Sequence, residues 1–175
     1  MITGWVGTVT TAGALVLSVA GCATDLRSRR IPNLLTFGGA LCAVGFHLVS
    51  EGPWGAALSA AGWLVGVALF APLFAVGGLG AGDVKLLGAL GAWLGPGRTL
   101  YLALFTAIAG GVMALVVMVA RGYSRSAGRN LLLMLTSWRL GIAAVPGLTL
   151  EDAAGPRLAY ALPIAAGTVL TLWLR

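Results

Sequence analysis

Long apolar runs recur along this chain, and only short polar stretches separate them. A helix needs about 20 mostly apolar residues to cross the hydrocarbon core of a bilayer. Charged residues make up 9% of the 175 residues, whereas a soluble domain is usually about one quarter charged. So little charge cannot cover a water-soluble surface. The sequence therefore predicts one all-α integral membrane domain over residues 1–175, with no soluble domain.

Six apolar runs are expected to cross the bilayer, and the fourth is too short to do so easily. The runs cover residues 5–24, 34–50, 56–77, 86–94, 99–120 and 158–174. The predicted architecture is a polytopic membrane helix bundle of about six transmembrane helices. A further stretch near residues 126–143 is apolar but short and is flanked by arginines, so an interfacial helix is expected there.

Basic residues gather in alternate loops of this predicted topology. The loops after the first, third and fifth runs hold nine of the eleven Lys and Arg residues. The positive-inside rule places such loops in the cytoplasm, so both termini are expected on the outer side. This topology accounts for the net charge of +6. The arginines form no basic stripe on a polar domain, so no nucleic-acid partner is expected.

The chain has only five acidic residues, and each can be considered separately. Glu51, Glu151 and Asp152 fall in predicted loops, where water can solvate them. Asp25 and Asp83 each adjoin an apolar run, and two predicted crossings separate them. Both are therefore expected at the cytoplasmic boundary of the membrane. Ionisable groups that border membrane-spanning segments are candidates for function.

Two carboxylates on one membrane face are what an aspartic peptidase needs. The ionised carboxylate takes a proton from the attacking water, and the protonated one stabilises the developing oxyanion. The sequence leaves open which aspartate is the acid. No Ser or Cys has a plausible base nearby, His47 is the only histidine, and no metal-ligand cluster is visible. Asp83 has a simpler interpretation as the N-cap of a helix that begins at Val84.

Two motifs carry a resemblance to a known family. The sequence Gly-Ala-Gly-Asp-Val-Lys at residues 80–85 resembles the GxGD-x-K signature of the type IV prepilin peptidases, which are intramembrane aspartic proteases. The segment 25–33 resembles the family's other signature, an Asp followed by basic residues and Ile-Pro-Asn. Residues 160–167 are similar to a looser closing motif, with Ala159 where proline is common.

This resemblance implies that Asp25 and Asp83 are catalytic, and that Gly80, Gly82 and Lys85 shape the site or bind substrate. The substrate would be a prepilin or pilin-like precursor, whose short basic leader is removed at the boundary between membrane and cytoplasm. The protein would be a multi-pass protein of the bacterial inner membrane, with its active site facing the cytoplasm.

The segment before Asp25 has 24 residues and lacks the tetracysteine zinc insert of larger family members, which also N-methylate the product. The chain thus resembles the short, peptidase-only branch associated with Flp/Tad-type pili. No metal, no S-adenosylmethionine and no N-methyltransferase activity are expected. Two alternatives remain from the residues alone. One is a small transporter or channel subunit with the same aspartates as ion or proton sites near mid-bilayer, and the other is a non-catalytic scaffold.

Overall fold

The computed structural model describes residues 2–75, 78–120 and 159–173, and the regular structure there is helical throughout. Its helices are α1 (Ile2–Ser28), α2 (Asn33–Ala75), α3 (Ala81–Ala120) and α5 (Ala161–Trp173). The prediction of an all-α membrane bundle is confirmed. The interfacial helix expected near residues 126–143 lies outside the described residues, as do Glu151 and Asp152.

The helices α1, α2 and α3 are long and apolar enough to cross a membrane. At 43 and 40 residues, α2 and α3 are about twice as long as one crossing needs. Each contains one glycine in the left-handed region, Gly52 with φ 74° and Gly95 with φ 76°. Glycine adopts this backbone without the clash of a Cβ. The next residue is Pro53 in α2 and Pro96 in α3, and proline suits the first turn of a helix.

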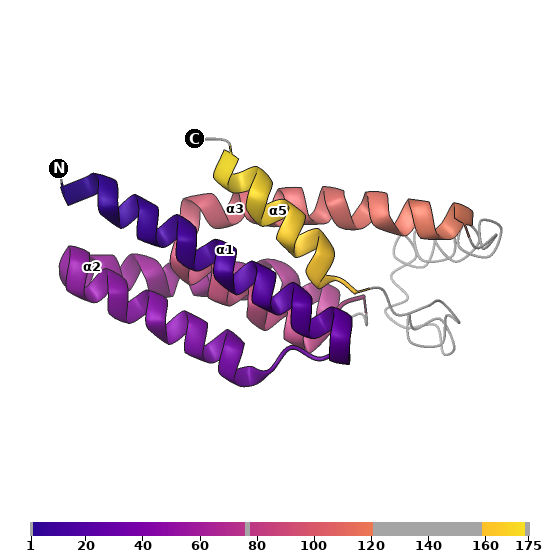
Figure 1. Ribbon diagram of the computed structural model, residues 1–175, viewed down its shortest axis with the longest axis horizontal. Coiled ribbons are helices and arrows are strands. Elements are labelled where there is room, and N and C mark those ends of the chain that lie inside the picture. The colour runs from indigo at the N-terminus through magenta and orange to yellow at the C-terminus, as the bar shows by residue number, and fades with distance from the viewer. Residues whose placement is uncertain (1, 76–77, 121–158, 174–175) are drawn as a thin grey trace, which may run out of the picture.

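The chain reverses direction at both glycines, so each long helix consists of two antiparallel segments (Figure 1). Lys85 hydrogen-bonds Asn33, the first residue of α2, while a Cβ on Gly66 would touch the backbone of Leu87. In a straight helix Asn33 and Gly66 would lie about 50 Å apart. The described chain therefore contains six helical segments. That each of them crosses a bilayer stays a prediction.

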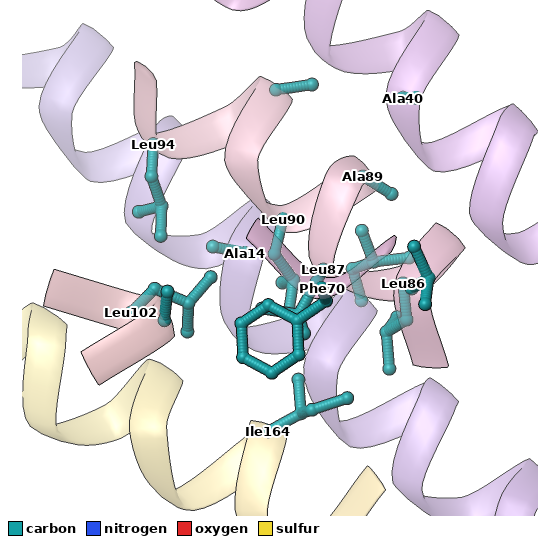
Figure 2. Close-up of a cluster of buried hydrophobic side chains, with 14 of the residues drawn as sticks. Ala14, Ala40, Phe70, Leu86, Leu87, Ala89, Leu90, Leu94, Leu102 and Ile164 are labelled. Atoms are coloured by element: carbon teal, nitrogen blue, oxygen red, sulfur yellow. The ribbon is translucent and has the colours of Figure 1, made fainter. Parts of the chain in front are cut away.

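Residues 81–94, the first segment of α3, form the buried centre of the bundle (Figure 2). Phe70 of α2, Leu102 of the second segment of α3 and Ile164 of α5 belong to the same buried cluster. The segment's own buried apolar side chains are Val84, Leu86, Leu87, Ala89, Leu90, Ala92 and Leu94. The fourth predicted run began at residue 86, but the helix begins five residues earlier. Because its neighbours surround it, this segment can be apolar on every face.

Glycines let the second segment of α2 pack directly on this central segment. A side chain on Gly62 would collide with the backbone carbonyl of Gly91, and a side chain on Gly91 would collide with that of Gly62. Small residues permit this close approach of helices in membranes. Nearby, the buried Ser59 hydroxyl donates to the Ala92 carbonyl oxygen at 2.7 Å, so the two segments also share a hydrogen bond.

Candidate functional site

Asp25 lies in the last turn of α1. The first predicted run ended at residue 24, but α1 continues to Ser28, so Asp25 is helical. The helix ends where Arg29, at φ 50°, enters the left-handed region and its N–H donates to the Asp25 carbonyl oxygen at 2.8 Å. A left-handed residue is the usual way to end a helix. The Asp25 carboxylate is half-buried at this end of the bundle.

Asp83 lies in the first turn of α3 and is 8% exposed. The Gly80 N–H donates to Asp83 Oδ2 at 3.1 Å, and the Asp83 N–H donates to the Gly80 carbonyl oxygen at 3.1 Å. The first bond is the side-chain half of a capping box, with Gly80 as the N-cap, and the second is an ordinary backbone bond of the first turn. The interpretation of Asp83 as the N-cap of a helix beginning at Val84 is therefore wrong. Asp83 instead lies three residues after the N-cap, and its side chain accepts a hydrogen bond from the N–H of that residue.

Both glycines of the GxGD sequence have contacts that a larger residue would disturb. A Cβ on Gly80 would lie 3.0 Å from Asp83 Oδ2, where it would crowd the carboxylate. A Cβ on Gly82 would lie 3.3 Å from the Cβ of Ile31, in the connection between α1 and α2. The first turn of α3 thus packs against the other sequence motif.

Lys85 joins the two motifs by a hydrogen bond. Its Nζ donates to Asn33 Oδ1 at 3.0 Å and lies 5.4 Å from the centre of the Phe37 ring. Within the described chain it forms no ion pair with Asp25 or Asp83. Lys85 therefore anchors the start of α3 to the start of α2, next to the turn that carries Asp83.

The N-terminus of α5 supplies a third part of the site. The Ala161 N–H donates to Asp25 Oδ2 at 3.4 Å. Tyr160 precedes it, and a Cβ on Gly110 would lie 2.6 Å from the Tyr160 hydroxyl oxygen. Tyr160 is also close enough to Asp83 to interact with it electrostatically. Sequence reasoning gave Tyr160 no role, although it stands in the loose closing motif directly before the last apolar run.

The structure brings the two aspartates together at one end of the bundle. Their carboxylates lie close enough to repel one another, although Asp25 and Asp83 are 58 residues apart in the sequence. Cys22 lies one turn before Asp25 and is close enough to interact electrostatically with the Asp25 carboxylate. Among the described residues, no three His, Cys, Asp or Glu side chains gather in the manner of a metal site.

The fold and the site thus define a membrane helix bundle with two neighbouring carboxylates at one end. The chain belongs to the type IV leader peptidase family, whose family model matches residues 12–115. The matched residues include Asp25, Asp83 and both glycines at which the chain reverses, while α5 follows them. Neither the curated proteins nor the solved structures give a match. The resemblance to this family is confirmed, and the protein is a peptidase that acts on a protein substrate.

Proposed function

We propose that this protein is an aspartic endopeptidase that removes the short basic leader from prepilin or pilin-like precursors. The observation that carries the proposal is the proximity of Asp25 and Asp83. Two carboxylates near one another favour opposite protonation states, one ionised and one protonated. Such a pair holds a base and an acid in one place.

The reaction uses both protonation states of the pair. The ionised carboxylate takes a proton from water as the water oxygen bonds to the carbon of the scissile carbonyl. The protonated carboxyl donates a hydrogen bond to the developing oxyanion. The C–N bond then breaks as the leaving amine takes up a proton. No metal, S-adenosylmethionine or other cofactor is required.

A backbone N–H group holds each of the two carboxylates. Gly80 donates to Asp83, and Ala161 donates to Asp25. A catalytic group works best when its rotamer is fixed by such supporting hydrogen bonds. Tyr160 has a phenol that can donate to a carboxylate or an oxyanion, so we assign it a positioning role beside Asp83.

The turn that precedes α3 supplies an approach for substrate. Gly78 and Gly80 are exposed beside the buried Asp83. Glycines leave room for an extended peptide to come close to a backbone. Gly80 and Gly82 thus shape the site, and Lys85 holds the turn in position through Asn33.

Charge at this end of the bundle supports a cytoplasmic active site. Arg27, Arg29 and Arg30 are exposed beside Asp25, and Lys85 lies beside Asp83. The positive-inside rule places such residues in the cytoplasm. A prepilin leader on that side, followed by an apolar helix in the bilayer, would present its scissile bond at the depth of the aspartates. The site would then act at the cytoplasmic face of the bacterial inner membrane.

The position of the acids counts against the transporter or channel alternative. That alternative expects acids near mid-bilayer, within broken helices. Asp25 and Asp83 instead lie at helix ends, and the family is one of peptidases.

The test is cleavage of a prepilin-like precursor by the full-length protein in liposomes. Asp25→Asn and Asp83→Asn should each lower kcat about 10²- to 10⁴-fold, the range of general acid–base catalysis. Ser28→Ala is the matched control, because the exposed Ser28 hydroxyl bonds only to backbone oxygens of Thr24 and Arg30. Full activity in either Asn variant would contradict the aspartyl mechanism. Equal cleavage of a precursor whose leader has lost its basic residues would contradict the proposed substrate.

A further inference from the structure

A cavity lies at the end of the bundle away from the aspartates. Its volume is about 600 Å³, and it is lined by α1 and by the reversals at Gly52 and Gly95. Gly95 is about 18 Å along the helix axis from Asp83, at 1.5 Å per residue. A cavity of this size is in the range of small-molecule sites, and no part of it belongs to the proposed peptidase site.

One basic side chain of this cavity makes no ion pair with any described residue. His47 Nδ1 lies 2.9 Å from Glu51 Oε2, and His47 Nε2 lies 3.3 Å from the Trp93 carbonyl oxygen. Arg98 also lines the cavity and makes no ion pair with any described residue. The described lining therefore holds a basic side chain, Arg98, and an acidic one, Glu51, which favours a group that carries charges of both signs.

Exposed aromatic side chains mark this end of the bundle as the level of lipid headgroups. Trp and Tyr are enriched where a membrane meets water. Four exposed aromatic residues lie near a helix terminus or a chain reversal at this end. The last turn of α5, which carries one of them, lies beside Thr8 of α1. Their exposed fractions are 50% for Trp5, 74% for Trp54, 58% for Tyr101 and 81% for Trp173.

The cavity wall is largely apolar where it faces this level. Val6, Leu58 and Leu94 line it, and Leu58 is 39% exposed on the outside of α2. An apolar wall that continues onto the outer helix surface suits a molecule with a polar head and an acyl chain. A soluble anion would gain nothing from it.

We propose that this cavity binds the headgroup of a zwitterionic phospholipid that carries a primary ammonium group, as phosphatidylethanolamine does. The Arg98 guanidinium binds the phosphate, for which its planar fork of donors is suited. Glu51, 45% exposed at its side chain, accepts the ammonium with its carboxylate. A choline headgroup has no N–H to donate, and a purely anionic headgroup offers Glu51 no donor besides that of His47. The proposal does not rest on the peptidase reaction.

The test is native mass spectrometry of the full-length protein in detergent with phosphatidylethanolamine or phosphatidylcholine. The protein should retain phosphatidylethanolamine about tenfold more tightly, because a hydrogen bond to a charged group contributes about 1.4 kcal/mol or more. Arg98→Gln should weaken both lipids about tenfold. Glu51→Gln should remove only the preference between them.

Arg30→Gln is the matched control, since Arg30 is an exposed arginine at the other end of the bundle. It should bind both lipids as the wild type does. Wild-type affinity in a monodisperse Arg98→Gln protein would overturn the proposal, as would equal retention of the two lipids by the wild type. Displacement of the lipid by millimolar inorganic phosphate would show a site for free phosphate instead.

Discussion

The two ends of this bundle arrange charge in opposite ways. At one end, Asp25 and Asp83 carry like charges and are held close enough to repel one another. At the other end, the side chain of His47 is basic and that of Glu51 is acidic. Nδ1 of His47 lies 2.9 Å from Oε2 of Glu51. Like charges held near one another cost free energy, which the rest of the fold must supply, whereas groups of opposite charge attract. The unfavourable arrangement is therefore the better indicator of catalysis.

Each end is also fixed by different means. The aspartate end depends on two hydrogen bonds between segments, from Ala161 and Lys85, and on the local bond from Gly80 to Asp83. The other end depends on two left-handed glycines that reverse the chain. Four predictions test how far this contrast extends.

The largest effect is expected from removing both aspartates. If Asp25 and Asp83 act on one water molecule, as we propose, Asp25→Asn/Asp83→Asn should lose no more activity than either single variant, about 10²- to 10⁴-fold in kcat. Single-turnover cleavage of the precursor measures this loss. If the fold-loss in kcat of the double variant equals the product of the two single losses, the two aspartates act independently. That result would contradict a paired function of the carboxylates at this end of the bundle.

The next effect concerns the contact between the central segment and α2. Gly62→Ala should lower the free energy of unfolding by about 1–3 kcal/mol or more, since its Cβ has no space beside the Gly91 carbonyl. Thermal unfolding in detergent measures this cost. Gly38→Ala is the matched control, because no atom lies within 4 Å of a Cβ there. It should be neutral or slightly stabilising, and an equal loss in both variants would contradict the packing explanation.

A smaller effect is expected at Tyr160. Tyr160→Phe keeps the ring but removes the hydroxyl, which packs on Gly110 and interacts electrostatically with Asp83. If the hydroxyl positions the carboxylate, kcat should fall about tenfold while KM stays the same, as for an interaction made only in the transition state. Steady-state kinetics at several substrate concentrations separate the two constants. A kcat within twofold of the wild type would limit Tyr160 to packing.

The smallest effect is expected for the hydrogen bond between the two motifs. Lys85→Met and Asn33→Ala should each destabilise the protein, and the double-mutant cycle should give a coupling free energy of about 0.5–1.5 kcal/mol. The bond is exposed, so water replaces part of it in each variant. Denaturant unfolding of the four proteins measures the coupling. Additive losses would mean that Lys85 and Asn33 act separately.

The sequence by itself determined the class of the fold and the candidate acids. Apolar runs and loop charges are local properties, and the bilayer turns them into helices and a topology. With so few acids in the chain, Asp25 and Asp83 were singled out before any contact was known. The sequence motifs around them indicated the type IV leader peptidase family, and the family comparison confirms that family.

The start of α3 shows where local reasoning failed. The sequence placed the start of this helix at Val84, but the helix begins at Ala81 and includes Gly82, although glycine is a poor helix former. The hydrogen bond from the Gly80 N–H to the Asp83 carboxylate and the burial of the whole first segment outweigh that propensity. Helix ends depend on such contacts, which a residue pattern does not contain.

Only the tertiary structure decided which groups surround the aspartates. The Ala161 N–H on Asp25, Tyr160 beside Asp83 and the bond from Lys85 to Asn33 all join residues distant in the sequence. The same holds for the cavity that Arg98 lines. Such contacts depend on how closely each helix approaches its neighbours and how far it is rotated about its axis. Side chains and glycines of several segments set these quantities together, so no single stretch of sequence specifies them.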